Sequence, residues 1–527
     1  MANRFLRSLA SASLLGLVAC HETTQYQPPP LDRFFFPTGM ALRHVDPNGN
    51  PCGGGFGGVP GCQTQLFVAS ADADLSYDPA TGGTVLGVDV GATVGLEEAG
   101  SPIGSPVWLG SGAGGLRGVR IGSYAGELAV LDAESCPTFQ QGQQAQLLVT
   151  SRAQNELYRI DITSPNGEIS CGHGAGGTCD SAHTVAVSNF GNTSSLTAGD
   201  SYGVSVVCAD LPAPLLGSSP GPQQLAFLTY LRVANGEGGL GILDLLNAPL
   251  GPPSWEDLGV SIAESTVFDP ISTRLFVTEM FGAVAVAPLR WLTLATPSVG
   301  YLAVNMENYV RGAEVRGVAL STDRTRLYLA LRIYDPVAAS QIGARPTTDT
   351  AGALVVVDAS AAALDPSELR ILNVVPLERG SSQVKIVPRP ASAGLRDLVA
   401  VLSEEDESLV LYDDETGAIA NVYGVCQSPP NLDGTPGPGD KNAPPPCDLG
   451  KPLLGQQPST LLVEPISPAA PEANGAQLAR LYVASFDRSW VNVILLDPLA
   501  PSSDPLSWVR IGLERAQVEI SNPPDPL

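Results

Sequence analysis

The sequence predicts an all-β fold, and three observations lead to that prediction. The 527 residues include 57 glycines and 46 prolines, a composition typical of many short strands joined by turns. Hydrophobic residues still make up 44% of the chain, so a large core can form. Segments rich in β-branched and aromatic side chains alternate between apolar and polar positions, whereas no comparable segment has a convincing helical period.

These strands recur as about seven units. The first strands that we expect lie at residues 37–42, 117–121, 202–207, 264–268, 316–320, 382–386 and 458–462. More apolar second strands follow at 66–70, 147–150, 225–229, 275–278, 327–331, 398–402 and 481–485. Third strands follow at 85–90, 156–161, 239–244, 283–287, 353–358, 408–412 and 491–497. Seven units of three or four strands predict a seven-bladed β-propeller, in which each blade packs on its neighbours.

The residue patterns of three units resemble a known repeat. Arg480–Ser485 followed by Val491–Asp497 resembles the YVTN-type propeller repeat, as do Arg274–Thr278 and Arg326–Leu329. The units are longer than the ~40–45 residues of compact blades, which predicts long loop insertions. Two of these insertions are expected at 122–146, between the first two strands of blade 2, and at 164–201, before blade 3.

We expect residues 34–513 to form the propeller and residues 514–527 to be a C-terminal tail. No terminal strand that would complete the last blade is evident in the sequence, although Phe34–Phe36 could pack there.

The N-terminus has the features of an export signal. Arg4 and Arg7 precede an apolar stretch at 6–18, which is too short to cross a bilayer. Leu17-Val18-Ala19-Cys20 then resembles the bacterial lipobox, in which the signal is cut before a cysteine that becomes lipidated. We therefore expect residues 1–19 to be a lipoprotein signal peptide and Cys20 to carry lipid. The alternative is an ordinary signal peptide with a chance cysteine.

The residues after Cys20 are typical of a tether. Residues 20–33 are polar, lack periodicity and include a stiff proline run at 28–30. The lipobox resemblance implies two or three acyl chains, because one chain anchors only marginally. Position 21 is His rather than the Asp that tends to retain such proteins at the inner membrane. The sequence thus predicts a lipid-anchored envelope protein, most simply at the outer membrane.

Charge and cysteine content narrow the environment further. The net charge of −25 argues against nucleic acid as a partner, because the phosphates would be repelled. Apart from Cys20, eight cysteines remain, an even number suited to an oxidising compartment. Eight cysteines allow 105 pairings. Proximity in the sequence favours Cys52 with Cys62, Cys171 with Cys179, Cys426 with Cys447, and therefore Cys136 with Cys208.

Several short motifs fit functional patterns only superficially. Four segments match G-x-G-x-x-G, but none opens a helix that could aim at a pyrophosphate. Gly217–Gly221 matches G-x-S-x-G, but Pro220 prevents the helix that a nucleophile elbow requires. Zinc ligand types occur together in Cys171, His173, Cys179 and His183, although a disulfide is favoured in this loop.

Three acidic turns raise the alternative of calcium binding. They are Asp46, Asn48 and Asn50; Asp72, Asp74 and Asp78; and the hairpin tip Glu404, Glu405, Asp406 and Glu407. Hard cations need several converging oxygens, and acidic turns are usually only solvated. We therefore expect no metal or other cofactor at these turns.

Two functional hypotheses remain. The first is a binding or scaffold protein that presents loops and a channel to envelope proteins, peptides or glycans. The second is a propeller enzyme, lactonase-like or dependent on a metal or cofactor, with its site in the channel. The YVTN-type resemblance implies that such a site would use first strands, where Arg117, Glu264 and Arg316 are the candidates. No catalytic constellation is recognisable, so we favour the binding hypothesis.

Overall fold

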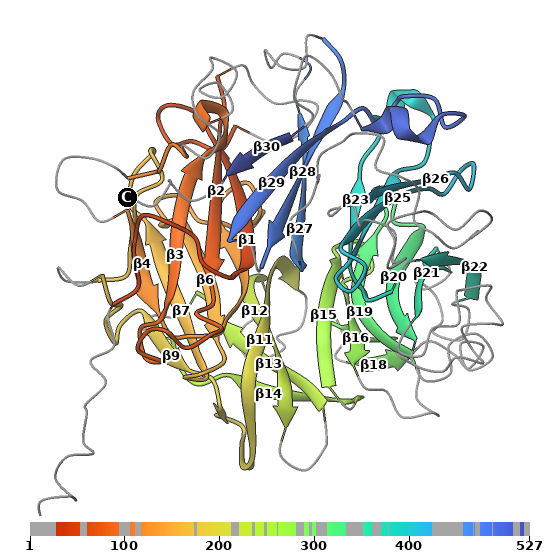
Figure 1. Ribbon diagram of the computed structural model, residues 1–527. Coiled ribbons are helices and arrows are strands. Elements are labelled where there is room, and N and C mark those ends of the chain that lie inside the picture. The colour runs from red at the N-terminus through yellow and green to blue at the C-terminus, as the bar shows by residue number, and fades with distance from the viewer. Residues whose placement is uncertain are drawn as a thin grey trace, which may run out of the picture.

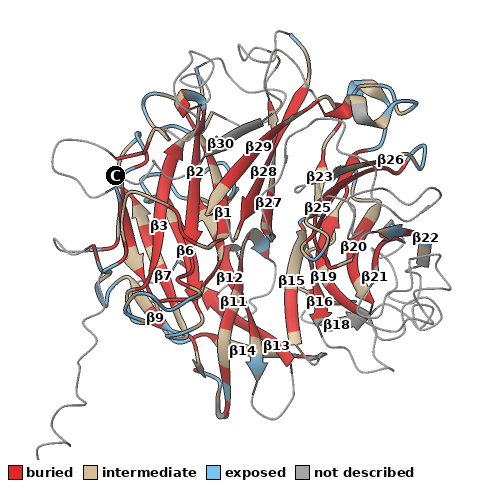
Figure 2. Cartoon of the chain, in the orientation of Figure 1, coloured by how far each residue is buried: buried red, intermediate tan, exposed pale blue. Residues whose placement is uncertain are grey.

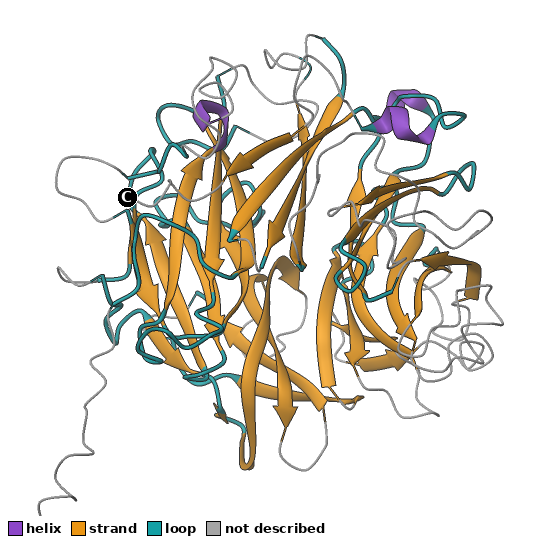
Figure 3. Ribbon diagram, viewed as in Figure 1, coloured by secondary structure: helices purple, strands orange, loops and turns teal. Residues whose placement is uncertain are grey.

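The computed structural model shows an all-β protein. It describes residues 28–52, 61–93, 106–110, 117–172, 177–211, 221–233, 238–246, 250–260, 262–280, 289–294, 298–301, 313–333, 351–360, 370–377, 379–423, 457–466, 468, 475–486, 489–509 and 517–520. Figure 3 shows that strands dominate and that helix is confined to short segments in loops. Two of these are the 3-10 turns η3 (Ala391–Ala393) and η5 (Pro505–Trp508).

The strands form seven antiparallel sheets arranged as the blades of a propeller (Figure 1). Blade 1 contains β1 (Pro37–Val45), β2 (Gln63–Ser70), β3 (Gly83–Asp89) and β4 (Gly118–Ile121). Blade 2 contains β5 (Ala125–Leu131), β6 (Gln146–Ser151), β7 (Glu156–Ile162) and β8 (Ile169–Ser170), with β9 (Thr184–Ala186) also paired to β7. Blade 3 contains β10 (Asn189–Phe190), β11 (Thr193–Leu211), β12 (Gly221–Val233), β13 (Gly238–Asp244) and β14 (Ser254–Val260).

The other four blades have four strands each. Blade 4 contains β15 (Ile262–Asp269), β16 (Arg274–Met280), β17 (Leu289–Thr293) and β18 (Ser298–Tyr301). Blade 5 contains β19 (Ala313–Leu320), β20 (Arg326–Ile333), β21 (Ala351–Asp358) and β22 (Arg370–Leu377). Blade 6 contains β23 (Ser381–Val387), β24 (Leu398–Ser403), β25 (Ser408–Asp413) and β26 (Ile419–Tyr423). Blade 7 contains β27 (Pro458–Ile466), β28 (Leu478–Ser485), β29 (Trp490–Leu496) and β30 (Gln517–Ile520).

The hydrophobic core lies between the blades. The second strand of a blade is the most buried, and every residue of β24 and β28 is buried (Figure 2). Such a strand has hydrogen-bonded neighbours on both edges and an adjacent blade on both faces, which explains its continuous apolar sequence. The packing crosses from blade to blade, because Leu411 of blade 6 and Leu481 of blade 7 belong to the same core cluster.

Each inner strand has an irregularity, which lies near the start of the strand in six blades and midway along the longer β11 of blade 3. The register of the first and second strands shifts between Pro37 and Gly39, Ala125 and Leu128, Ser201 and Val204, Ala263 and Thr266, Val315 and Gly317, Ser381 and Gln383, and Pro458 and Thr460. Bulges of this kind re-aim side chains and bend strands. Here they occur at the same end of the channel in all seven blades.

Neighbouring inner strands approach closely at these bulges. The Thr38 hydroxyl donates to the Ala125 carbonyl oxygen at 2.8 Å, and the Thr460 hydroxyl donates to the Thr38 carbonyl oxygen at 2.6 Å. A Cβ on Gly126 would overlap the carbonyl oxygen of Tyr202 in the next blade. The glycine is therefore required by the close packing of blades 2 and 3.

We predict that Gly126→Ala lowers the free energy of unfolding by about 2 kcal/mol or more, because a methyl group here forces two backbones apart. Chemical denaturation measures this change. The matched control is Gly251→Ala, because no heavy atom lies within 4 Å of its Cβ position. Equal stability of the two variants would contradict the close packing of blades 2 and 3.

None of the described strands is exchanged between blades 1 and 7 to close the ring. Blade 1 is built from the N-terminal part of the chain, blade 7 from the C-terminal part, and β1 contacts β27 directly. Phe36 packs on Phe486 of blade 7 with ring centroids 5.0 Å apart, as expected for the aromatic run. The strand β30 lies within the predicted C-terminal tail and completes blade 7, so the expectation that no terminal strand does so is wrong.

Blade 2 differs from the prediction. The segment 117–121 contains β4, the outer strand of blade 1, and the inner strand of blade 2 is β5. The expected insertion at 122–146 is thus partly strand, and the one at 164–201 contains β8, β9, β10 and the start of β11. In blade 4 the third strand is β17, whereas the predicted segment 283–287 lies outside the described residues.

Three of the four expected cysteine pairs form disulfides: Cys52 with Cys62, Cys136 with Cys208, and Cys171 with Cys179. The second of them connects the β5–β6 loop of blade 2 to β11 of blade 3. The pair Cys426 and Cys447 lies outside the described residues. These disulfides indicate an extracytoplasmic location. Among the residues that the structure describes, no helix is long and apolar enough to span a bilayer.

Candidate functional site in the channel

The inner strands enclose a cavity of about 160 Å³ in the channel. Every blade contributes to its wall. The lining residues are Gly39, Met40, Glu127, Leu128, Val204, Ser205, Ser265, Thr266, Gly317, Val318, Gln383, Val384, Lys385, Thr460, Leu461 and Leu462. Most of these residues lie in or just after the inner-strand bulges. The bulges therefore decide which side chains reach the channel.

Tyr202, Glu264 and Arg316 occupy equivalent bulge positions in blades 3, 4 and 5. Arg316 Nη1 lies 3.0 Å from Glu264 Oε1, and Arg316 Nε lies 3.8 Å from Glu314 Oε2. Glu264 and Glu314 are 8% and 2% exposed, so this charge cluster is largely withdrawn from water. We call these four residues the mouth cluster; each lies at or beside an inner-strand bulge.

Burial dominates the protonation of Glu264. It raises the pKa of the Glu264 carboxyl to about 8, with Arg316 opposing the rise and the nearby Glu404 and Glu314 adding to it. Like charges and a low dielectric both disfavour the ionised form. At neutral pH most molecules therefore hold a proton on Glu264.

A second layer of charge surrounds the mouth cluster. Arg332 lies opposite Glu314 in the β19–β20 register and reaches Glu404 and Glu405, with N–O distances of 3.4 Å to each. Burial raises the pKa of Glu404, while Arg316 and Arg332 oppose the rise. Glu404, at the hairpin tip 404–407, thus contacts a residue beside the channel mouth. The expectation that this turn is only solvated is wrong for Glu404.

Lys385 and Glu127 carry the charges inside the cavity. Lys385 comes from β23 of blade 6 and Glu127 from β5 of blade 2, on nearly opposite sides of the ring. Burial raises the pKa of Glu127, and the charge of Lys385 opposes this rise. The two side chains, both within the described part of the chain, form no direct ion pair of 4.0 Å or less.

The structure brings together two of the three candidates from sequence. Glu264 and Arg316 lie in direct contact, whereas Arg117 is exposed beside the outer strand β4 and lies away from the channel. Sequence reasoning missed Glu127, because blade 2 was given the wrong inner strand. It also passed over Lys385. The chain has only three lysines, and the position of this one in a predicted inner strand was an available signal.

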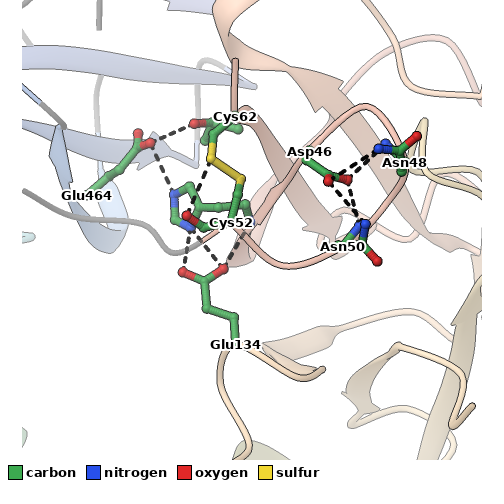
Figure 4. The surroundings of a disulfide bond; sticks show 9 residues. Asp46, Asn48, Asn50, Cys52, Cys62, Glu134 and Glu464 are labelled. Atoms are coloured by element: carbon green, nitrogen blue, oxygen red, sulfur yellow. Dashed lines mark hydrogen bonds and ion pairs between the residues drawn. A yellow bond between two sulfur atoms is a disulfide. The ribbon is translucent and has the colours of Figure 1, made fainter. Parts of the chain in front are cut away.

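The other acidic turns are explained by local hydrogen bonds. The Asp46 carboxylate accepts backbone N–H groups from Asn48 at 2.8 Å and Asn50 at 2.9 Å, and Figure 4 shows both asparagines turned toward it. Hydrogen bonds from Asn50 lower the pKa of Asp46. Asp72 is buried and accepts the Ser123 hydroxyl at 2.8 Å, in a contact between turns.

Cys171 and Cys179, which were considered as possible zinc ligands, form the disulfide that the sequence favours. His183 instead contacts Asp180 and Asp161, and His173 lies outside the described residues. Across the described ranges, no group of three or more His, Cys, Asp or Glu side chains could hold a metal ion.

A separate, largely buried network lies where blades 1 and 7 meet, beside the Cys52–Cys62 disulfide, and includes Glu134 from the β5–β6 loop of blade 2 (Figure 4). His44 Nδ1 lies 3.0 Å from Glu134 Oε1, and His44 Nε2 lies 3.1 Å from Glu464 Oε1. Glu464 also accepts the Thr64 hydroxyl at 2.6 Å and pairs with Arg480 at 3.2 Å. We call this group of residues the closure network.

The closure network shifts two pKa values in opposite directions. Burial alone would lower the pKa of His44, but hydrogen bonds to Glu134 and Glu464 raise it to about 9. Burial alone would raise the pKa of Glu464, but His44 and Arg480 lower it to about 2. Both groups are therefore charged in the folded protein near neutral pH.

Comparison with solved structures finds several similar chains, all at low sequence identity and low TM-score. It is similar to Sqt1 from Chaetomium thermophilum, with 13% identity, 91% of this chain and 85% of that chain covered, and a TM-score of 0.44. The Dos1 propeller shares 10% identity, with 86% and 94% covered and a TM-score of 0.40. A putative 6-phosphogluconolactonase from Bacteroides fragilis shares 10% identity, with 73% and 94% covered and a TM-score of 0.38.

No family model matches the chain, and no curated protein matches it either. At these identities and TM-scores, no activity, substrate or partner is carried over from the similar structures.

Proposed function

We propose that this protein is a lipid-anchored binding module of the bacterial cell envelope, held at the outer membrane through Cys20. The observation that carries the binding role is the channel cavity, to which all seven blades contribute and which is lined by one basic and one acidic side chain. Such a ring resists deformation and holds its polar groups in place, which favours binding by lowering the entropy lost when a ligand is ordered. Its loops offer further surfaces to envelope proteins, peptides or glycans.

The anchor has a direct test. Cys20→Ser removes the acceptor thiol, so we expect the protein to move from the membrane fraction to the soluble fraction of the envelope. Immunoblotting of fractionated cells measures this distribution. The matched control is Ser13→Ala, which changes the signal region but keeps the lipobox cysteine. Tight membrane association of the Cys20 variant would contradict the lipid anchor.

The scaffold role is tested by gentle detergent extraction from the native membrane and mass spectrometry of the extract. We expect a protein, peptide or glycan that co-purifies in stoichiometric amount and is lost after denaturation. A protein that purifies alone, with no bound molecule of any kind, would contradict a constitutive scaffold.

The second candidate function is a hydrolytic enzyme that acts at the mouth cluster. The observation that favours it is the Glu264 carboxyl, whose pKa of about 8 lets it hold a proton at neutral pH beside Arg316. Such a group can donate a proton to a leaving oxygen, as lactone or ester hydrolysis requires. Turnover of a lactone panel that is abolished by Glu264→Gln would support this candidate.

A further inference from the structure

We infer that the channel cavity binds a small zwitterion, a molecule the size of an amino acid with one carboxylate and one ammonium group. The site consists of Lys385 and Glu127, which face the cavity from blades 6 and 2. The inference deepens the proposed binding function by naming a ligand class, and it does not depend on the lipid anchor.

The charges of the cavity wall are matched and separated. Among the described residues that line the cavity, Lys385 is the one basic side chain and Glu127 the one acidic side chain. Because they do not contact each other, each charge lies in a partly dehydrated site without its opposite partner at ion-pair distance. A half-buried charge is unfavourable unless it is paired and hydrogen-bonded. A ligand with one group of each sign would pair with both side chains at once.

Several neutral polar side chains of the wall are already engaged in hydrogen bonds. The Thr266 hydroxyl donates to Ser205 Oγ at 2.8 Å, and the Thr460 hydroxyl donates to the Thr38 carbonyl oxygen at 2.6 Å. The Gln383 amide donates to the Ser459 carbonyl oxygen at 3.1 Å. These contacts stiffen the wall and leave the two charged side chains as its main means of recognition. The lining therefore favours a doubly charged ligand over a neutral sugar.

The volume limits the ligand. A cavity of about 160 Å³ is smaller than the roughly 300–1,000 Å³ of pockets for drug-sized molecules. It corresponds to the liquid volume of on the order of five water molecules. Glycine, alanine and short ω-amino acids are of suitable size, whereas a folded peptide segment is not. The length of the best ligand will report the spacing between Lys385 and Glu127.

Isothermal titration calorimetry on the full chain in detergent tests the inference. The probes are glycine, alanine, β-alanine and γ-aminobutyrate, with acetate and ethylammonium as singly charged controls. We expect at least one zwitterion to bind with a stoichiometry near one, and both controls to bind at least tenfold more weakly. Lys385→Met and Glu127→Gln should each weaken zwitterion binding at least tenfold. The control Arg232→Gln, at a side chain that is 73% exposed, should leave it unchanged.

Each result decides between stated alternatives. Acetate binding as tightly as any zwitterion would replace the inference with a simple anion site on Lys385. Binding of none of the zwitterions to wild-type protein with an intact far-ultraviolet circular dichroism spectrum would overturn it. A stoichiometric partner in the detergent extract would then still support the proposed binding function, so the two failures are distinguishable. If the variants do not fold, the wild-type panel alone decides.

Discussion

Replacing Glu464 with glutamine will lower the free energy of unfolding by about 3–5 kcal/mol at pH 6, because it removes one partner from a buried charge network. Glu464 is 5% exposed and receives hydrogen bonds from Thr64 and Tyr482 in addition to its contacts with His44 and Arg480. The amide is neutral and cannot accept at both ends, so Arg480 and His44 would lose the buried carboxylate that they share, and His44 would keep Glu134 alone of its two acidic partners.

The position of this network in the ring explains why the effect should be global. Blades 1 and 7 come from opposite ends of the described chain, and no exchanged strand joins them. Their contact instead depends on side chains, among them the closure network and the Phe36–Phe486 ring pair. Loosening this contact opens the ring, and every blade then loses the support of its neighbours. We therefore expect a cooperative loss of structure rather than local fraying.

The pH dependence of stability follows from the two shifted groups. The pKa of Glu464 is lowered from 4.5 to about 2, so its contribution is present above pH 4.5 and is lost as the pH falls toward 2. The pKa of His44 is raised from 6.5 to about 9, so its contribution is present below pH 6.5 and is lost as the pH rises through 9. We expect the closure network to stabilise the ring most between about pH 5 and 6.5.

Urea unfolding of wild type and Glu464→Gln at pH 3, 6 and 10 measures these effects. The difference between the two proteins should be largest at pH 6 and should shrink at both extremes. The control is Glu415→Gln, because Glu415 is 43% exposed and its pair with Arg396 should contribute less than about 1 kcal/mol. A Glu464 variant no less stable than this control at pH 6 would show that ring closure does not depend on the network.

The fold was largely predictable because its signal is local. Strands such as 398–402 and 481–485 are continuous apolar runs, and the structure confirms them as fully buried second strands. Inner and outer strands are harder to distinguish. Arg117-Gly118-Val119 and Arg316-Gly317-Val318 have the same three residue types, yet one opens an outer strand and the other lies in an inner strand. Which of them reaches the channel depends on the packing of whole blades.

Short edge strands gave an equally weak signal. The strand β30 has only four residues, Gln517–Ile520, and pairs through the backbone with β29 alone. Four alternating residues near a chain end cannot be told from a tail by periodicity.

The candidate site was predictable in part. Glu264 and Arg316 come from first strands of successive blades, so their proximity follows once the ring is assumed. Lys385 and Glu127 meet the same cavity from distant parts of the chain, and no spacing rule links positions so far apart. Glu314 was missed for another reason. It precedes the predicted strand at 316–320 by two residues and so lay outside the segment considered, although residues two apart in a strand share a face and Glu314 contacts Arg316.

Glu264→Gln is expected to raise stability at pH 9 and to leave it nearly unchanged at pH 4. The folded-state pKa of Glu264 is about 8, against an ordinary value of 4.5, so the folded protein holds this proton more tightly than the unfolded chain. Stability is then greatest below pH 4.5, falls as the pH rises from 4.5 to 8, and levels off above that. At about 1.4 kcal/mol per pH unit, the ionised carboxylate lowers stability by on the order of 5 kcal/mol. Glutamine does not ionise, so the variant does not lose this stability at high pH.

Arg316→Met should have the opposite effect. Without the guanidinium, the Glu264 and Glu314 carboxyls lose their nearest cation, and stability at pH 9 should fall by about 3–5 kcal/mol. The loss should be smaller at pH 4, where protonation removes the repulsion between the two carboxylates. The exposed control Glu168→Gln should change stability at neither pH.

Thermal or chemical unfolding at pH 4 and pH 9 decides between two accounts of the mouth cluster. If Glu264→Gln stabilises the protein at pH 9, burial outweighs the attraction of Arg316 and the carboxyl is a proton donor at neutral pH. If the same change destabilises the protein at pH 9, the ion pair outweighs burial and Glu264 is ionised throughout. The second result would mean that Glu264 holds no proton at neutral pH and cannot act as the acid in hydrolysis. Binding would then be the role that the channel charges support.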